Sequence, residues 1–156
     1  MKSPKLSFVG YSSLVLAACV GTDSQMKPDT SLEGTSWRLE EIRYPSSSIR
    51  IGDAEAYTML LQPDGRASLQ LDCNRGFGQW TASSHHDGTG GEFAISDMGV
   101  TKAMCPPASN SDKVTADIQR FAKFTIDGEN LVTSLADGSA SYVWIPTSAT
   151  DETEPE

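Results

Sequence analysis

Residues 57–72 read YTMLLQPDGRASLQLD, and this stretch decides what kind of fold the chain forms. A Pro-Asp-Gly turn at 63–65 separates its two halves, because proline fixes φ and glycine supplies the positive φ that such a turn needs. In the second half Ala67, Leu69 and Leu71 share one face with a period of two, as a half-buried strand requires. The stretch therefore predicts an antiparallel hairpin with one face in a core.

The same alternation continues on both sides of this hairpin. Asp-Gly pairs at 127–128 and 137–138 separate alternating runs near the C-terminus, and Asp-Gly between such runs is a strong hairpin signal. The other predicted strands are the run around Trp37 and Leu39, residues 76–80, the run around Phe93 and Ile95, and segments 123–126, 130–135 and 141–145.

One segment has the period of a helix instead. Its apolar residues follow the i, i+4, i+7, i+8 spacing and are Val114, Ile118, Phe121 and Ala122. We therefore predict one amphipathic helix near residues 111–122. The whole is then an α+β fold, mostly antiparallel β, with a curved sheet or partial barrel of about seven or eight short strands.

The first residues have the pattern of a cleaved export signal. Lys2 and Lys5 precede the apolar stretch 6–18, which is shorter than the roughly 20 residues that a permanent membrane span needs. Leu16-Ala17-Ala18-Cys19 resembles the bacterial lipobox. That resemblance implies cleavage between Ala18 and Cys19, and a lipid anchor of several acyl chains, palmitate among them, on Cys19.

The anchor divides the chain into four parts. Residues 1–18 are the predicted signal peptide, 19–31 the lipidated cysteine with a flexible linker, 32–146 a single folded domain, and 147–156 a disordered acidic tail. Val20 resembles the default sorting residue of Gram-negative lipoproteins. We therefore expect the protein in the cell envelope, held by Cys19 in the bilayer of the outer membrane and facing the periplasm.

The charge excludes one class of partner. The formal net charge is −9, and removal of the signal peptide with its two lysines would make the charge more negative still. Binding to nucleic acid without sequence preference needs Lys and Arg to neutralise phosphates. We therefore expect no nucleic-acid partner, and a monomer.

Once Cys19 carries lipid, two cysteines remain. Because compartments beyond the inner membrane are oxidising, we predict a disulfide between Cys73 and Cys105; two buried free thiols are the alternative. A loop of about 32 residues closed in this way stabilises a fold by roughly 3–4 kcal/mol in the chain-entropy model.

Five short blocks of sequence together resemble the META domain, the HslJ-like family of small bacterial envelope proteins. They are LEGTSWRL at 32–39, Gly65-Arg66, CNRG at 73–76, Gly78 before Trp80, and TKAMCP at 101–106. The resemblance covers about residues 32–146 and implies a single β-rich domain in proteins that are often lipoproteins. It implies no catalytic residues.

No set of residues predicts catalysis. The sequence has no Gly-x-Ser-x-Gly elbow, no phosphate-binding glycine loop and no His-Glu-x-x-His. His85, His86 and Asp87 could ligate a transition metal, but we interpret their polar segment 83–91 as a solvated hairpin tip. We therefore expect no enzyme activity, no cofactor and no metal site, and leave open whether the two histidines have any metal affinity.

Two further groups of residues allow a functional and a structural interpretation. Met98, Met104 and Cys105 could form a copper site, but methionine more often fills a core and the predicted disulfide would use the thiol. The three tryptophans, Trp37, Trp80 and Trp144, could line a ligand groove, but we expect them in the core.

The leading hypothesis from the sequence is a noncatalytic, membrane-anchored envelope lipoprotein that binds or stabilises another envelope component, with a possible link to stress. One alternative is a protein inhibitor of a periplasmic or host hydrolase, such as lysozyme or a protease, because a rigid loop binds at low entropic cost. The other is a small-ligand carrier that uses a barrel mouth.

Overall fold

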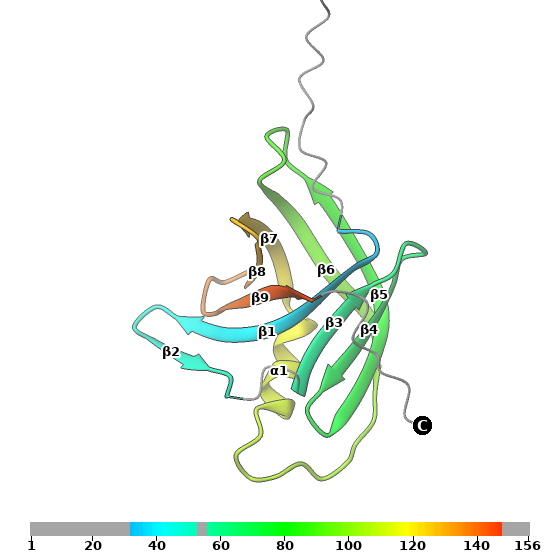
Figure 1. Ribbon diagram of the computed structural model, residues 1–156, viewed down its shortest axis with the longest axis vertical. Coiled ribbons are helices and arrows are strands. Elements are labelled where there is room, and N and C mark those ends of the chain that lie inside the picture. The colour runs from blue at the N-terminus through cyan, green and yellow to red at the C-terminus, as the bar shows by residue number, and fades with distance from the viewer. Residues whose placement is uncertain (1–31, 53–55, 148–156) are drawn as a thin grey trace, which may run out of the picture.

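The computed structural model describes residues 32–52 and 56–147, and within them the chain forms a closed antiparallel barrel (Figure 1). The strands are β1 (Thr35–Tyr44), β2 (Ser47–Arg50), β3 (Tyr57–Leu61), β4 (Arg66–Leu71), β5 (Asn74–Ser84), β6 (Gly90–Val100), β7 (Phe121–Asp127), β8 (Asn130–Leu135) and β9 (Ser141–Thr147). Their order is β2-β1-β3-β4-β5-β6-β7-β8-β9, and β1 also pairs with β9. Eight strands therefore form the barrel wall, and β2 extends it beside β1.

The predicted fold class is confirmed: the domain is mostly antiparallel β with one short helix. The hairpin at 57–72 is β3 and β4, in which Met59 pairs with Leu69. Gly65 has a φ of 83°, and the Gln62 N–H donates to the Arg66 carbonyl at 2.8 Å across the turn. The Pro-Asp-Gly sequence therefore forms the predicted turn, because Gly65 supplies the positive φ that the turn needs.

The predicted helix is correct in place and wrong in length. α1 covers Ser111–Ile118, and Phe121 and Ala122 begin β7 instead. Val114, Ile118 and Phe121 are all buried in one core, so their spacing matched a single helical face. The match is coincidental beyond Ile118, because a side chain on a strand can reach the same core as a side chain on the preceding helix.

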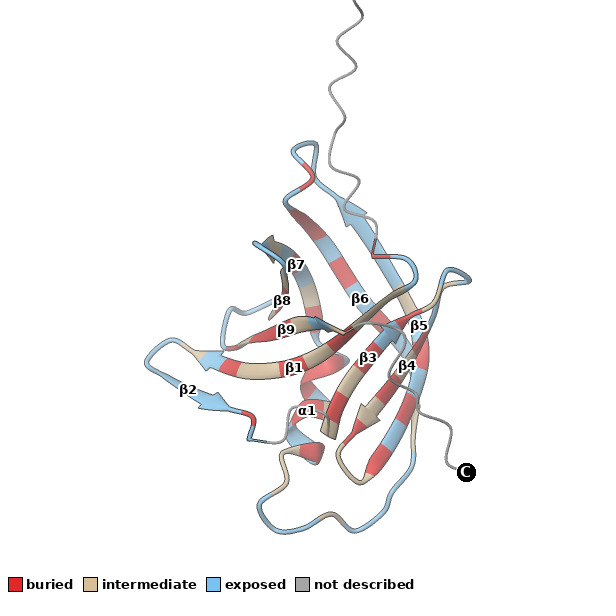
Figure 2. Ribbon diagram, in the orientation of Figure 1, coloured by how far each residue is buried: buried red, intermediate tan, exposed pale blue. Residues whose placement is uncertain are grey.

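The interior of the barrel is filled by side chains. Figure 2 marks the buried residues, and along β3 and β4 they alternate with half-buried or exposed ones, as a wall with one face in a core requires. Five aromatic rings meet in this core with centroids 5.1–6.5 Å apart: Phe93, Phe121, Phe124, Tyr142 and Trp144. α1 lies at one end of the barrel and adds Val114 and Ile118 to the same core.

Some predictions fall outside the described residues. These are the signal peptide, the cleavage site at Ala18, the lipidated Cys19, the linker, and residues 148–156 of the acidic tail. Thr147, the first residue of that predicted tail, is the last residue of β9 and pairs with Ser36. Among the described residues, no helix has the length and apolar character needed to cross a bilayer.

Glycine at position 91 allows β5 and β6 to approach closely, and this gives a first prediction. A β-carbon at Gly91 would lie 1.8 Å from the Ser83 carbonyl oxygen, a backbone atom that cannot rotate away. Gly91→Ala should therefore lower the free energy of unfolding by about 3 kcal/mol, the upper end for an overpacked site. Urea denaturation checks this.

Gly52→Ala is the matched control, because a β-carbon there would have no neighbour within 4 Å. Equal urea midpoints for Gly91→Ala and the unmodified protein would contradict the close approach of the two strands.

Candidate functional site

The two cysteines of the domain lie where two irregular segments meet the barrel. Cys73 follows β4 in the turn before β5, and Cys105 lies in the segment between β6 and α1. The structure joins them in the predicted disulfide, with their Cα atoms 5.4 Å apart. The bond ties residues 101–110 to the barrel wall, although no strand pairing holds most of that segment.

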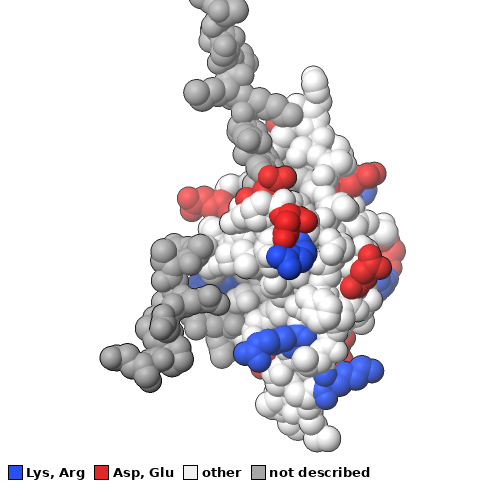
Figure 3. All heavy atoms as spheres, turned by 90° about the vertical axis from the view of Figure 1, so that its right-hand side faces the viewer, with Lys and Arg blue, Asp and Glu red and all other residues white. Residues whose placement is uncertain are grey.

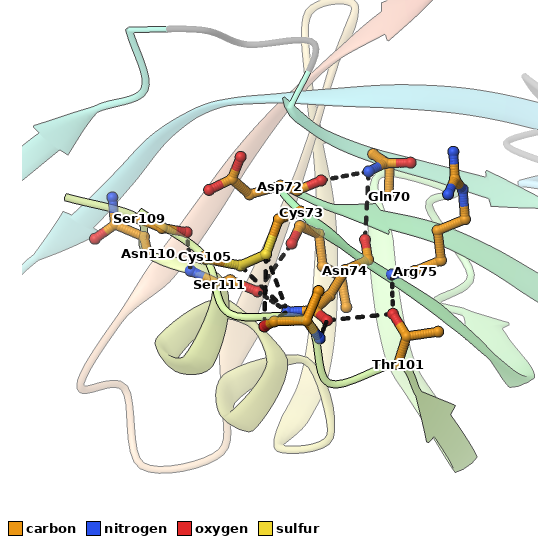
Figure 4. Close-up of a disulfide and its surroundings, with 12 residues drawn as sticks. Gln70, Asp72, Cys73, Asn74, Arg75, Thr101, Cys105, Ser109, Asn110 and Ser111 are labelled. Carbon is orange, nitrogen blue, oxygen red and sulfur yellow. Dashed lines mark hydrogen bonds between the residues drawn. A yellow bond between two sulfur atoms is a disulfide. The ribbon is translucent and has the colours of Figure 1, made fainter. Parts of the chain in front are cut away.

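Asn74 is the centre of this junction, as Figure 4 shows. Its Oδ1 accepts the Ala103 N–H at 2.7 Å and the Thr101 hydroxyl at 3.2 Å. Its Nδ2 donates to the Ser111 hydroxyl at 3.2 Å and lies 3.2 Å from the Cys105 sulfur. With only 5% of its surface exposed, the amide satisfies both its polar ends inside the protein.

The junction also fixes where α1 begins. The Ser111 hydroxyl donates to the Leu71 carbonyl at the end of β4, at 2.8 Å. The Tyr57 hydroxyl accepts the Asn110 N–H at 3.0 Å. The first turn of α1 is therefore bound to β3, β4 and β5 through side chains, which positions its buried face over the end of the barrel.

Asp117 forms a second polar centre, near the other end of α1. This buried carboxylate accepts from Lys113 Nζ at 2.8 Å, Arg120 Nη1 at 3.2 Å and the Tyr142 hydroxyl at 2.5 Å. Arg120 also contacts Asp137 at 2.8 Å, in the turn between β8 and β9. The cluster therefore connects α1 to the strands on the opposite side from the disulfide.

Hydrogen bonds decide the charge state of this cluster. Burial alone would raise the pKa of the Asp117 carboxyl, but hydrogen bonds from Lys113 and Tyr142 outweigh it and the pKa lies below its ordinary value. The pKa of Tyr142 is raised by burial and by its hydrogen bond to Asp117. The carboxylate is thus charged at neutral pH and fully occupied by donors within the fold.

The structure places the two histidines in an exposed turn. His85, His86 and Asp87 lie at the exposed tip of the β5–β6 hairpin, where Asp87 Oδ1 accepts the Thr89 N–H at 3.1 Å. That hydrogen bond lowers the pKa of Asp87 and closes the tip. Among the described residues, no three His, Cys, Asp or Glu side chains gather as a metal ion would require.

The methionines and tryptophans are also separated. Met104 is fully exposed, Met98 packs against the core, and Cys105 is bonded to Cys73. Trp37 and Trp144 are buried, and the half-buried Trp80 packs against the core while its Nε1–H donates to the Gln62 carbonyl at 2.9 Å. Neither set lines a common groove.

A shallow hollow opens on the surface between β5, β6 and β7. Its lining includes Ser83, Glu92, Ala94 and Ala122, and Glu92 is its only titratable side chain. The lining includes the hydroxyl groups of Thr81 and Ser83 but no second acid and no histidine. The arrangement offers a place for water or a small group and no acid–base pair.

The closed barrel, the helix at one end of it and the disulfide junction describe a small β-barrel domain whose interior is filled by its own side chains. The chain belongs to the META domain family: the family model matches residues 30–144, which confirms the resemblance seen in the five sequence blocks.

One solved structure is similar in fold. It is a DUF4847 family protein from Bacteroides vulgatus, 10% identical, which covers 73% of this chain and 93% of its own with a TM-score of 0.49. So distant a likeness says nothing about activity. No curated protein matches the chain.

Sequence reasoning found the disulfide and missed the two polar centres. Asn74 stood next to Cys73 in one of the family blocks, and that adjacency was the available signal. Asp117 has Lys113 four residues before it and Arg120 three residues after it, a charge pattern that a helix brings together.

The Asn74 junction yields a second prediction. Asn74→Ala would leave the Ala103 N–H and the Ser111 hydroxyl without the amide, so we expect a loss of about 2–3 kcal/mol in the free energy of unfolding. Urea denaturation under oxidising conditions measures it. Asn130→Ala, at a partly exposed position in β8, is the control and should change the midpoint little. Equal losses for both variants would refute the role of the junction.

The Asp117 cluster yields a third prediction, on pH. Because the folded pKa of Asp117 is below its unfolded value, its contribution to stability is present above about pH 4 and is lost as the pH falls through the folded pKa. Asp117→Asn should therefore cost about 1–3 kcal/mol at pH 7 and progressively less in that acid range. Urea denaturation of both proteins from pH 7 to pH 2 measures the difference.

Asp64→Asn is the control, since Asp64 is paired with Arg66 on the surface and surface pairs contribute little. A stability gap between the Asp117 variant and the unmodified protein that stays constant down to pH 2 would show that the carboxylate charge is not what stabilises the helix.

Proposed function

We propose that this META-domain barrel is a noncatalytic, lipid-anchored component of the bacterial envelope that binds or stabilises another envelope component through its outer surface. The observation that carries the proposal is the filled interior. Among the described residues, twenty-two buried hydrophobic ones pack as one cluster inside the wall and under α1. A domain without an internal chamber has its outer face available for recognition.

The small-ligand carrier is less well supported for the same reason. A carrier needs a concave, mostly apolar pocket of a few hundred Å³ that encloses its ligand. The surface hollow beside β6 is open and partly polar in its lining, with Thr81, Ser83 and Glu92 along it. It would leave most of an apolar ligand in water.

The inhibitor alternative rests on the β5–β6 hairpin. This hairpin extends past the neighbouring strands at the end of the barrel opposite α1 (Figure 1). Its tip is braced by the His85 N–H, which donates to the Gly90 carbonyl at 2.7 Å, and by the Asp87–Thr89 hydrogen bond. A braced, exposed loop could enter the cleft of a hydrolase, and loss of inhibition on changing residues 85–89 would favour that function.

The proposal gives a fourth prediction, on the full-length protein in its native membrane. Chemical crosslinking in intact cells should join the protein to a defined envelope component. Cys19→Ala should release the protein from the membrane fraction and abolish the crosslink, because one covalent anchor holds the domain close to its partner. Immunoblotting of membrane and soluble fractions reads out both effects.

Ser24→Ala, a change in the same predicted linker, is the control and should leave the anchor and the crosslink intact. A Cys19→Ala protein that stays in the membrane fraction would refute the anchor. Robust hydrolysis of envelope substrates by the purified protein, removed by a single substitution on its surface, would refute the noncatalytic assignment.

A further inference from the structure

One part of the outer wall differs from the rest of this acidic protein. Four residues follow one another across the strands there, by register: Leu60 on β3 pairs with Ser68 on β4, Ser68 with Phe77 on β5, and Phe77 with Gly99 on β6. Side chains of directly paired residues project from the same face of a sheet. We call this row and the cations beside it the Phe77 face.

Phe77 is the aromatic member of the row and its most exposed residue. It is 67% exposed, and Leu60 in the same row is 37% exposed. A β-carbon at Gly99 would lie 2.5 Å from the end of the Phe77 ring, so the ring rests directly on the glycine. Because Gly99 has no side chain, the Phe77 ring can pack directly against the sheet. The opposite side of the ring is exposed to solvent.

This arrangement has a purely structural interpretation, in which Phe77 covers Gly99 and shields the sheet at that point. Coverage alone does not account for the charges beside it. Arg75, two residues before Phe77 on the same face of β5, makes no side-chain hydrogen bond or ion pair with any described residue. Lys102, next to the Thr101 that is bonded to the Arg75 backbone, is likewise exposed and unpaired within the described chain.

Arg75 does not point toward Asp72, an acid beside the junction. In Figure 4 the Arg75 side chain points to the opposite side of the disulfide from Asp72. Figure 3 shows this side of the molecule: positive side chains lie at its lower end, and the positive side chains higher up lie beside negative ones. Arg66, which lies two residues before Ser68 on the same face of β4, is by contrast paired with Asp64 at 2.7 Å.

A fully exposed methionine lies two residues after Lys102 in the same segment. Met104 is 100% exposed and lies in the segment 101–105, which the Asn74 amide and the disulfide hold against the start of β5. Aromatic residues, methionine and arginine are the types enriched where proteins meet. Here they are presented by a braced wall, so little conformational entropy is lost when a partner binds.

We propose that the Phe77 face is the docking surface for an acidic segment of a partner protein, whose carboxylates pair with Arg75 and Lys102 and whose apolar side chain packs on the Phe77 ring. The inference deepens the proposed function, since it names the surface and the chemistry of the partner. Charge complementarity supports it: Arg75 lies on the face of the open ring and Lys102 follows the residue bonded to Arg75, and these cations, unpaired within the described residues, favour an anionic occupant.

The direct test uses the full-length protein in detergent and a short fluorescent peptide of glutamates around one central phenylalanine. Fluorescence anisotropy should show saturable binding that weakens as salt is added, and no binding of the counterpart peptide built on lysines. Phe77→Ser and Arg75→Glu should each weaken binding roughly tenfold or more, the effect of losing a central contact. Phe77→Tyr keeps the ring and should bind as the unmodified protein does.

Matched controls come from β2, away from this face. Ile49→Ser removes an exposed apolar side chain and Arg50→Glu reverses an exposed cation, and neither should change the affinity. Thermal unfolding of every variant reports folding, and Arg75→Glu carries the test if Phe77→Ser unfolds.

Three outcomes would overturn the proposal: no saturable binding of the acidic peptide, equal weakening by the β2 variants, or binding that appears only after residues 148–156 are removed. The last result would make the acidic end of this chain the occupant in place of a partner.

A photo-crosslinking residue placed at position 77 or at position 49 in intact cells separates this proposal from the proposed function. A defined adduct from position 49 and none from position 77 would preserve binding to an envelope component and overturn the Phe77 face. No adduct from either position would count against both.

Discussion

The hydrogen bonds of one buried amide hold the irregular part of this protein to its regular part. A closed barrel satisfies the backbone of its own strands, but the chain between β6 and α1 is not a strand and must be fixed by other means. Asn74 supplies them, with Oδ1 bonded to Thr101 and Ala103 and Nδ2 to Ser111. The Cys73–Cys105 bond beside it limits how far the same segment can move in the unfolded chain.

The position of α1 depends on this junction, and the filled interior depends on α1. Val114 and Ile118 are fully buried at the end of the barrel, where open strands would otherwise expose the aromatic core to water. Asp117 secures the other end of the helix through Lys113, Arg120 and Tyr142. Because the interior is occupied, the recognition that we propose would use the outer wall, where Arg75 and Phe77 lie on one face of β5.

Much of the wall could be predicted from local patterns, and the reasons are visible at single residues. The turn between β3 and β4 could be predicted from Gly65, because a residue that tolerates positive φ is needed to close it. The alternation of Ala67, Leu69 and Leu71 with polar residues predicted β4 as a strand with one face in the core. The strand β2 was missed, since all four of its residues are exposed and it has no buried face to create a period. The helix was predicted too long because Phe121 continues an apolar spacing from a helix into a strand.

The sequence by itself determined the class of fold, the pairing of the two domain cysteines and the family, because turn chemistry, alternation and short blocks of residues are local properties. Only the tertiary structure decided that the sheet closes, that the barrel is filled, and that Asn74 and Asp117 are its polar centres. Closure requires β9 to pair with β1 across more than 90 residues of chain, as Thr147 does with Ser36, and no local pattern specifies such a partner. In the same way, only the pairing of β5 with β6 places Gly99 beneath the Phe77 ring and leaves the other side of the ring exposed.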